Sequence, residues 1–463
     1  MLALPVLPID TGRYGMPEMV RIFEEESRLR KMLLVEAALA KAHAELGNIP
    51  REDAERIWEV ATSGVVKLER VKEIEAEIKH ETMAVVRALA EACGPSGRYV
   101  HLGATSSDIL DTALALQLKE ALAILKDRLA ELTALVARLA EEHKGTIMVG
   151  RTHGQHALPI TLGFKLAVWA AELLRHLKRL EECEERVLVG KMSGAVGTMA
   201  GLGPRALELQ ELVMSILGLR AAEISTQIVQ RDRLAELICL LAILASTLDN
   251  MATEVRELQR TEIGELAEPF DERAQVGSST MPHKRNPITC ERICGLAKVV
   301  RGLVVPALEN VPTWHERDLT QSSAERFIVP EALILTDYMI YLMIKVLSGL
   351  EIRPDRMKEN LALTKGLIMS EALMLELTRR GMARDEAYRL VRSLALTAMR
   401  SGRPFAEVVL EDEAIRALIG PDELKDLLRP EGYLGMATKQ VEKVISLVSA
   451  HPLVARHLRR RTR

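Results

Sequence analysis

The stretch LKEALAILKDRLAELTALVARL, residues 118–139, decides the fold. Its large apolar residues recur alternately four and three positions apart, which places them along one stripe of an α-helix. They are Leu118, Leu122, Leu125, Leu129, Leu132, Val136 and Leu139. This spacing is typical of a coiled coil or a bundle helix. It predicts a helix of about 35 residues, roughly 50 Å long at 1.5 Å per residue.

Four further long segments have comparable patterns, namely residues 159–189, 231–265, 291–308 and 323–350. Five long helices joined by loops form a bundle. Several of these segments are apolar on more than one face, so a single bundle would expose apolar surface to water. We therefore expect the long helices to pack against those of neighbouring subunits in a homo-oligomer. Only 3% of the residues are aromatic, and a core of small aliphatic side chains suits long packed helices, so the predicted fold class is all-α.

Two smaller helical domains are expected to flank the bundle. Residues 1–108 should form an N-terminal domain, with one helix over residues 17–46 and two more that end near Gly64 and Cys93. The polar stretch HLGATSSD, residues 101–108, cannot be helical throughout. The bundle domain should cover residues 109–354. Turn signals at Gly381, 402–404, 420–421 and 430–432 predict shorter helices in a C-terminal domain over residues 355–463.

Composition excludes several classes of partner. The net charge is -3 and both signs are abundant, which argues against general attraction to nucleic acid or an anionic membrane. The N-terminus MLALPVLPID lacks the basic start of a signal peptide, and the apolar run 237–245 is too short to span a bilayer. We expect a cytoplasmic protein that binds small molecules. The five cysteines contain no CxxC pair, so no zinc site or disulfide framework is expected.

Polar, glycine-rich islands lie between the long helices. In GRTHGQHALP, residues 150–159, two histidines stand three apart with no nearby Cys, Asp or Glu, which is a poor metal site. A single histidine acting as general acid fits better, because imidazole titrates near neutral pH. The alternative is a loop histidine that hydrogen-bonds a backbone carbonyl.

In the island GSSTMPHKRNP, residues 277–287, a glycine and two serines are followed by a lysine and an arginine, which Pro282 and Pro287 bracket. It looks like a flexible loop that folds over an anion, and the alternative is a phosphorylatable or merely solvated basic loop. A phosphate-binding P-loop is excluded, because no GxxxxGK[ST] pattern is present.

Two more islands carry anion-binding groups. In WHERDLTQSSAER, residues 314–326, Arg317, Ser322, Ser323 and Arg326 could hold a phosphate or a carboxylate. The alternative is that Glu325 and Arg326 simply open the next helix and pair within it. The segment GRYGMPEM, residues 12–19, precedes a helix N-terminus, where anions bind readily.

Together these islands resemble the fumarase/aspartase superfamily. Its signature loop GSSxMPxKxNP is matched by Gly277, Ser278, Ser279, Met281, Pro282, Lys284, Asn286 and Pro287. Within that superfamily, several further segments are similar to the adenylosuccinate lyase family: Arg13-Tyr14, Lys79-His80, His101 with Thr105 and Ser106, Thr152-His153, residues 225–227 and HERD…SSAER. The likeness covers nearly the whole chain and fades in the last hundred residues.

The resemblance implies a homotetramer with a multi-helix core, whose active sites each draw residues from three subunits. It implies elimination of fumarate from adenylosuccinate, giving AMP, and from the succinylated aminoimidazole carboxamide ribotide (SAICAR), giving AICAR, in purine biosynthesis, with no cofactor and no metal. Ser278 would be the general base and His153 the general acid, which Glu291 would orient.

The resemblance also assigns the groups that bind substrate. Lys284 and Asn286 would hold the succinyl carboxylates. Those on the phosphate would be Arg13, Tyr14, Arg317, Ser322 and Arg326. Further substrate contacts would come from Thr105, Ser106, Gln227, Lys79, His80, Glu81, His101, Ser279, Met281 and Ser323.

Three positions depart from the family pattern: Glu81 where Asp is frequent, Leu158 where Glu is common, and Gln321 where relatives often have His. None removes a proposed acid or base. The alternatives are another fumarate-releasing lyase, such as argininosuccinate lyase or the carboxymuconate cycloisomerase, and an inactive helical scaffold of the kind found among lens crystallins. Argininosuccinate lyase and the carboxymuconate cycloisomerase act on substrates without a phosphate. The arginines of residues 12–19 and 314–326 therefore argue against both.

Overall fold

The computed structural model describes residues 7–460, and most of them are helical, which confirms the all-α prediction. The chain divides into two compact units. The first unit comprises Met1–Leu129, Arg175–Leu248 and Gly295–Tyr341, and the second comprises Ala130–Leu174, Asp249–Cys294 and Leu342–Arg463. These divisions fall within long helices. The three domains expected at residues 1–108, 109–354 and 355–463 stay a prediction.

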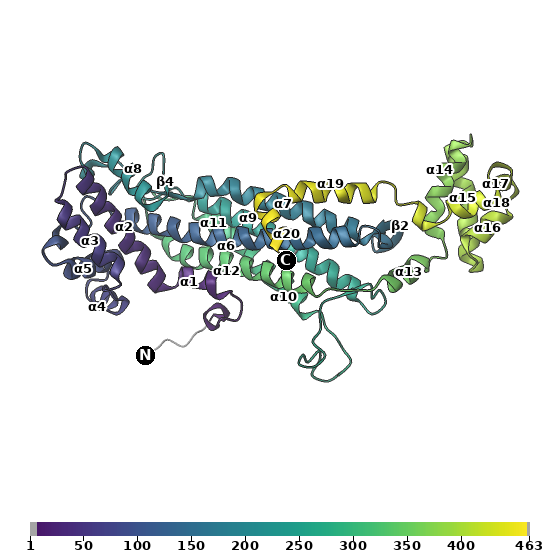
Figure 1. Cartoon of the computed structure of the whole chain (residues 1–463), viewed down its shortest axis with the longest axis horizontal. Helices are drawn as coiled ribbons and strands as arrows, with labels where there is room; N and C mark the ends of the chain where they lie inside the picture. Colours follow the sequence, from purple (N-terminus) through teal and green to yellow (C-terminus); the bar gives the residue numbers. More distant parts are fainter. Residues whose placement is uncertain (1–6, 461–463) are drawn as a thin grey trace. The chain divides into compact units, whose positions relative to one another are not determined.

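The long helices appear where the apolar spacing predicts them (Figure 1). They are α6 (Ser106–Glu142), α7 (Leu162–Val187), α9 (Asp232–Gln259), α10 (Ile288–Gly302) and α12 (Thr320–Ser348), with the short α11 (Val304–Glu309) after α10. On α6 the predicted stripe is buried from Leu118 to Val136, with Leu139 only partly covered. The four-three spacing therefore identified the buried face of this helix.

The N-terminal part of the first unit contains more helices than we predicted. They are α1 (Pro17–Phe23), α2 (Glu25–Glu45), α3 (Arg51–Ser63), α4 (Leu68–Ile78) and α5 (Glu81–Cys93). The single helix expected over residues 17–46 was wrong, because Glu24 is extended, with ψ 147°. Likewise Lys79 adopts a left-handed conformation, with φ 57°, and separates α4 from α5. The apolar periodicity continues across both breaks.

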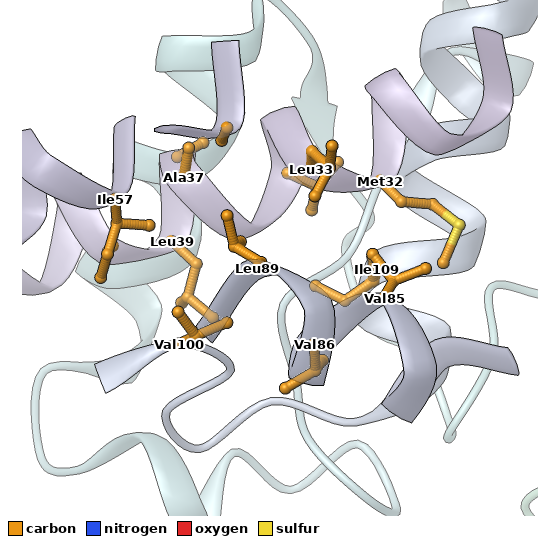
Figure 2. Close-up of a cluster of buried hydrophobic side chains, with 14 of the residues drawn as sticks. Met32, Leu33, Ala37, Leu39, Ile57, Val85, Val86, Leu89, Val100 and Ile109 are labelled. Carbon is orange, nitrogen blue, oxygen red and sulfur yellow. The ribbon is translucent and has the colours of Figure 1, made fainter. Parts of the chain in front are cut away.

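A compact apolar core holds these helices together. Figure 2 shows side chains of α2, α3 and α5 meeting, among them Leu33, Ile57 and Leu89, with Ile109 from the first turns of α6. The short helices η1 (Pro8–Thr11) and η2 (Gly94–Tyr99) lie before α1 and after α5. The segment 101–105 is a turn, and α6 begins only at Ser106, as the polar stretch predicted.

A β-hairpin precedes α7, where we predicted that a helix begins at Pro159. Strands β1 (Ile147–Thr152) and β2 (Gln155–Thr161) pair antiparallel, and α7 starts at Leu162. The two residues between the strands are His153 and Gly154, and both have positive φ, 54° and 73°. Positive φ at both central positions defines the two-residue turn whose twist suits a hairpin. His153 therefore stands at the tip of a rigid ribbon.

Two minimal sheets complete the strands of the described residues. In the first unit, β3 (Val189–Gly190) pairs parallel with β4 (Arg220–Ala221), and η3 (Ala200–Leu202) and α8 (Ala206–Leu217) lie between them in sequence. In the second unit, β5 (Leu266–Ala267) pairs antiparallel with β6 (Glu351–Ile352).

The C-terminal part of the second unit consists of short helices, as the turn signals predicted. They are α13 (Pro354–Ala362), α14 (Ser370–Arg379), α15 (Arg384–Ser401), α16 (Phe405–Glu411), α17 (Glu413–Leu418), α18 (Pro421–Leu427), α19 (Ala437–Ser449) and α20 (Pro452–Arg460), with η4 (Leu367–Met369) and η5 (Pro430–Gly432). Helices α14–α18 share a core that includes the fully buried Phe405.

Helices α9 and α12 are long and apolar enough to cross a membrane by length and composition, although the run 237–245 alone is too short. Such a result for two helices is weak evidence for a membrane span, because the core helices of soluble proteins pass the same test. Here 56% and 67% of the two apolar windows are buried inside the chain. Burial inside the chain therefore accounts for much of the apolar character of the two helices.

A buried ion pair fixes the start of α6. The side chains of Asp108 and Lys191 form this pair, and both are fully buried. Asp108 also accepts hydrogen bonds from the backbone N–H groups of Thr105 at 2.8 Å, Ser193 at 2.8 Å and Gly194 at 3.1 Å. Because a buried charge without a partner is costly, this carboxylate ties residues 101–105 to the glycine-rich segment after β3.

We predict that Asp108→Ala lowers the free energy of unfolding by about 3–5 kcal/mol, because it leaves the Lys191 ammonium buried without a counter-charge. Thermal and denaturant unfolding of the purified protein measure this effect. The control is Glu208→Ala, which breaks an ion pair with Arg205 in which both side chains are 54% exposed, and which should leave stability nearly unchanged. Equal stability losses in the two variants would contradict the assignment.

Candidate active site

The first unit contains a cavity of about 440 Å³. Its wall combines apolar side chains of α2, α4, α5 and α6, such as Met32 and Val85, with charged and polar side chains from residues 317–326. Residues of four helices and of the island WHERDLTQSSAER therefore meet here, although they are up to about 300 positions apart in the sequence. A pocket with an apolar wall and a few convergent polar groups is the usual form of a small-molecule site.

Glu81 lies at this cavity between two arginines. One oxygen of its carboxylate forms an ion pair with Arg28, and the other forms one with Arg326. Burial raises the pKa of the Glu81 carboxyl, but the two guanidinium groups outweigh burial and hold the pKa below its usual value. Glu81 is therefore charged at neutral pH. It pairs with Arg326, which the sequence analysis assigned to the phosphate of the substrate.

Arg231 is a different kind of cavity arginine, because its charge is satisfied within the protein. Its guanidinium donates to both oxygens of Asp111, at 2.8 and 2.9 Å, and its Nε donates to Glu325 at 2.7 Å. Burial raises the pKa of Asp111, but Arg231 lowers it more. This network fixes Arg231, the residue before α9. Because its guanidinium is already paired with two carboxylates, Arg231 is not available to bind an anionic ligand. Glu325 is thus part of a buried network that links segments distant in sequence, and does not simply pair with Arg326.

Arg317 and Gln321 have polar groups without partners. Arg317 Nη1 donates to Gln227 Oε1 at 3.1 Å, but its buried Nε has no hydrogen-bond partner among the described residues. Gln321 is 1% exposed and lines the cavity, and its Oε1 likewise lacks a partner within residues 7–460. Buried polar groups are nearly always hydrogen-bonded. A donor and an acceptor unpaired in one cavity wall suit a ligand that carries both oxygens and hydroxyl groups.

Ser322 and Ser323 follow in the first turn of α12, and Arg326 lies one turn further. Ser322 and Arg326 both line the cavity, while Ser323 is exposed to solvent. The structure thus brings together five of the predicted groups, namely Glu81, Gln227, Arg317, Ser322 and Arg326. It adds Arg28 and Gln321, which sequence reasoning had not placed in the site. Arg28 lies within a charged helix face and carries no local signal of a binding role.

His101 is held by a carboxylate that the sequence did not reveal. Its Nδ1 lies 2.7 Å from Oε1 of Glu36, which is 1% exposed on α2. Burial lowers the pKa of His101, but Glu36 and Asp108 raise it more, so the pKa lies above its usual value. Nearby in sequence, Thr105 precedes α6 and Ser106 is its first residue. The segment 101–106 therefore presents an imidazole and two hydroxyl groups before a helix N-terminus.

Lys79 and His80 lie between α4 and α5, and both are exposed. His80 caps α5, because its Nδ1 accepts the backbone N–H of Met83 at 3.3 Å. Its ring is thereby oriented by the helix that also carries Glu81.

Arg13 and Tyr14 lie elsewhere on the first unit. The Tyr14 ring packs against Tyr338 of α12 at a centroid distance of 6.3 Å, and the Arg13 guanidinium lies 5.9 Å from the Tyr14 ring. Tyr338 is 12 positions beyond Arg326 on the same helix, which corresponds to about 18 Å along its axis. Within one chain, the structure does not bring Arg13 and Tyr14 to the Arg326 end of α12.

The second unit carries the loop of residues 277–287, which joins β5 to α10 and extends away from the helices next to it (Figure 1). Its two ends are tied together, because Asn286 Nδ2 donates to the carbonyl oxygen of Gly277 at 2.9 Å. A Cβ atom on Gly277 would lie 2.0 Å from the carbonyl oxygen of Lys284, so the base of the loop tolerates only glycine. The loop is closed at its base, and Ser279, Met281 and Lys284 are exposed along it.

Ser278 stands just inside this base. Its Oγ accepts hydrogen bonds from the backbone N–H groups of Thr280 at 3.3 Å and Met281 at 3.1 Å. Both donors face the oxygen that would become negative if the hydroxyl lost its proton. Hydrogen bonds to a charged oxygen contribute about 1.5–3 kcal/mol each.

A second buried carboxylate fixes the helix after the loop. Glu268 is 3% exposed and accepts the backbone N–H groups of Thr289, at 3.0 Å, and Cys290, at 3.0 Å. These groups belong to the first turn of α10, where negative charge is stabilising. Glu291 follows on the same turn, exposed to solvent. Sequence reasoning missed Glu268, because an isolated glutamate near a proline looks like an ordinary surface residue.

The hairpin that bears His153 is anchored in the same unit. Arg151 donates to both oxygens of the fully buried Glu265, at 3.0 and 2.7 Å, and Asn360 donates to the same carboxylate at 2.8 Å. His153 itself is exposed, with its imidazole open to solvent. The structure therefore presents the His153 side chain to solvent on a turn whose strand is anchored. Within residues 7–460, no group of three His, Cys, Asp or Glu side chains is suited to hold a metal ion.

Comparison with known proteins identifies relatives along almost the entire chain. A family described as "Lyase" matches residues 12–302, and one described as "Adenylosuccinate lyase C-terminus" matches residues 366–444. The adenylosuccinate lyase of Pyrococcus abyssi is 57% identical over 96% of this chain and 98% of that protein. That of Methanocaldococcus jannaschii is 52% identical over 96% of each chain.

Solved structures agree on the fold. A fumarate lyase from Mesorhizobium sp. BNC1 has a TM-score of 0.87 at 34% identity and covers 94% of this chain and 98% of its own. A 3-carboxy-cis,cis-muconate lactonizing enzyme from Pseudomonas putida has the same TM-score and identity and covers 97% and 100%. With its C-terminal part matched as well, this chain is an enzyme that belongs to the adenylosuccinate lyase family.

Proposed function

We propose that this protein eliminates fumarate from adenylosuccinate to give AMP, and from SAICAR to give AICAR, without a cofactor. Full-length relatives that are named adenylosuccinate lyase support the first reaction. The second requires the same succinyl group and the same phosphorylated ribose. The observation that carries the proposal is the Ser278 oxygen held by two backbone N–H groups on a loop closed at its base.

Elimination needs a base to take the proton beside a carboxylate and an acid to protonate the departing nitrogen on the opposite face. Ser278 is the proposed base. Its two N–H donors stabilise the alkoxide, and the nearby positive charge of Lys284 adds to this when the loop closes and excludes water. No covalent intermediate is required.

His153 is the proposed acid, and Glu291 is proposed to orient it. An imidazole suits this role because it titrates near neutral pH. The Arg151–Glu265 anchor supports the assignment, since a proton donor must be held within hydrogen-bond reach of the leaving nitrogen.

The carbanion formed in this reaction carries two negative charges on one carboxylate, so preorganised donors matter most. We propose Lys284 and Asn286, with Thr105, Ser106 and Gln227, for the succinyl carboxylates. Ser279, Met281 and Ser323 are proposed to border the substrate, as are Lys79, His80 and His101.

The phosphate is assigned to Arg317, Ser322 and Arg326, with Arg13 and Tyr14 also proposed for it. The unpaired Nε of Arg317 and the positions of Ser322 and Arg326 in one cavity support this assignment. Arg13 and Tyr14 lie near Tyr338, about 18 Å along α12 from Arg326. We therefore propose that they bind the phosphate in the active site of a neighbouring subunit of a homotetramer. Exposed apolar side chains on the long helices support that assembly: Val168, Ile243, Val299, Phe327 and Tyr341. We also propose that the protein is cytoplasmic.

A second candidate reaction is lactonisation or cycloisomerisation of a carboxymuconate, because solved structures of such enzymes share the fold at 30–34% identity. Its substrate has no phosphate, which leaves the arginine-rich cavity unexplained. The assay that separates the candidates supplies adenylosuccinate, SAICAR, argininosuccinate and carboxymuconate separately to the pure protein. We expect fumarate from the first two only. Turnover of carboxymuconate without nucleotide cleavage would reverse the assignment.

Ser278→Ala and His153→Ala are each expected to reduce kcat by about 10²–10⁴-fold, the usual contribution of an acid or a base. Substrate binding should persist, because neither change removes an anion-binding group. Steady-state kinetics and calorimetric titration measure the two properties. The controls are Thr280→Ala, which keeps its backbone N–H, and His156→Gln in the same hairpin, and both should stay within about tenfold of the wild type. A fully active Ser278→Ala or His153→Ala enzyme would remove that residue from its role.

Arg326→Ala is expected to raise KM for adenylosuccinate by about 10–100-fold, since a charge-assisted hydrogen bond to phosphate contributes roughly 1.5–3 kcal/mol. The fall in kcat should be much smaller, because Arg326 is far from the reacting bonds in this assignment. Arg21→Ala, an exposed arginine of α1 outside the cavity, provides the control. An unchanged KM in Arg326→Ala would disprove the phosphate assignment.

A further inference from the structure

The contact between Glu81 and Arg326 bears on how the proposed phosphate site discriminates between anions. The inference drawn from it rests on the proposed function. Glu81 divides its two oxygens between Arg28 and Arg326. The three side chains are unequally exposed, at 24% for Glu81, 30% for Arg28 and 56% for Arg326. Arg326 is the arginine most accessible to a ligand, while Arg28 is the more sheltered anchor.

The proposed phosphate site therefore already contains an anion, the Glu81 carboxylate. Any ligand that binds Arg326 must displace the Glu81 carboxylate from it or bind beside that negative charge. A carboxylate from solution is the same chemical group as the one it would replace, and Glu81 has the advantage of being held in place. A phosphate ester carries nearly two negative charges and three acceptor oxygens, so it interacts more strongly with the arginine.

The surroundings favour such an exchange. When a phosphate takes Arg326, Glu81 can remain paired with Arg28. The phosphate can also reach the unpaired Nε of Arg317 and the hydroxyl group of Ser322, which line the same cavity. A carboxylate offers these three groups only two oxygens, whereas a phosphate offers three and can give each group an oxygen of its own.

This discrimination matters for the proposed substrates, because each carries two carboxylates on its succinyl group and one phosphate. Arginines bind both kinds of anion well. An open arginine cluster would therefore also accept the succinyl end and hold the molecule in reverse, away from Ser278 and His153.

We propose that Glu81 is a specificity-determining residue, an internal carboxylate that occupies Arg326 until a phosphate replaces it, and so keeps carboxylates out of the phosphate site. Removing its charge should make the site bind all anions more tightly and discriminate less between them. If Glu81 merely supported the fold, or held Arg326 ready for phosphate, removing its charge would instead weaken phosphate binding.

The test is calorimetric titration of the full-length protein with inorganic phosphate and, separately, with succinate at low ionic strength. Glu81→Gln should tighten phosphate binding about fivefold, the effect of one partly exposed ion pair. It should tighten succinate binding by a larger factor, so that the preference for phosphate narrows. Glu81→Asp keeps the charge on a shorter side chain and should give an intermediate gain, which also provides a result if Glu81→Gln folds poorly.

Two controls locate the effect. Glu25→Gln removes another carboxylate from the cavity wall, one that pairs with Lys72, and phosphate affinity should change less than about twofold. Adding Arg326→Ala to Glu81→Gln should abolish the gain. Equal or weaker phosphate binding by Glu81→Gln, an equal gain in Glu25→Gln, or a gain that survives without Arg326 would each overturn the proposal.

Failure of this inference is distinguishable from failure of the proposed reaction. The titrations require no turnover, so an unchanged phosphate affinity in Glu81→Gln overturns the role of Glu81 even if the wild type releases fumarate. A wild type that releases no fumarate from either nucleotide overturns the reaction itself.

Discussion

Buried carboxylates that accept backbone N–H groups or pair with arginine and lysine hold the non-helical segments of this protein to the ends of its long helices. Asp108 fixes the start of α6, and Glu268 fixes the start of α10. Asp111 holds Arg231 before α9, and Glu265 holds the hairpin through Arg151. Because an unpaired buried charge is strongly unfavourable, each carboxylate permits few arrangements of the segment it binds. The hairpin and the segments that lead into α6, α9 and α10 are attached to the helical framework in this way.

This arrangement explains how a protein made of helices can present the proposed catalytic groups. Helical side chains are rigid but face the core or the solvent, whereas loops place groups freely but lack rigidity. The hairpin and the closed loop combine the two properties, since their bases are fixed while His153, Ser279 and Lys284 stay exposed. Ser278 lies at the boundary, where backbone N–H groups already surround its oxygen. A loop anchored in this way can close over a substrate without losing the geometry of its base.

The sequence predicted the long helices well, because the apolar stripe of α6 and its counterparts repeats over many turns. It failed where the backbone changes while apolar periodicity continues, as at Glu24 and at the strand before Leu162. The loop of residues 277–287 and the segment of residues 314–326 were recognisable as unusual local patterns in the sequence. Glu36, Glu265 and Glu268 were not, because their importance comes from burial against residues distant in the sequence. Charge pairs such as Glu81 with Arg326 are invisible for the same reason.

In the proposed reaction, Ser278 removes the proton from the carbon next to a carboxylate while Arg326 holds the phosphate. The most direct measurement is an experimental structure of the Ser278→Ala oligomer with unreacted adenylosuccinate bound. The proposed mechanism predicts that Cβ of residue 278 lies within about 4 Å of the carbon that loses its proton, since reacting atoms approach to roughly 3–3.5 Å. It also predicts His153 on the departing nitrogen and the phosphate on Arg326. A bound substrate whose succinyl group lies out of reach of residue 278, or whose carboxylates occupy Arg326, would contradict it.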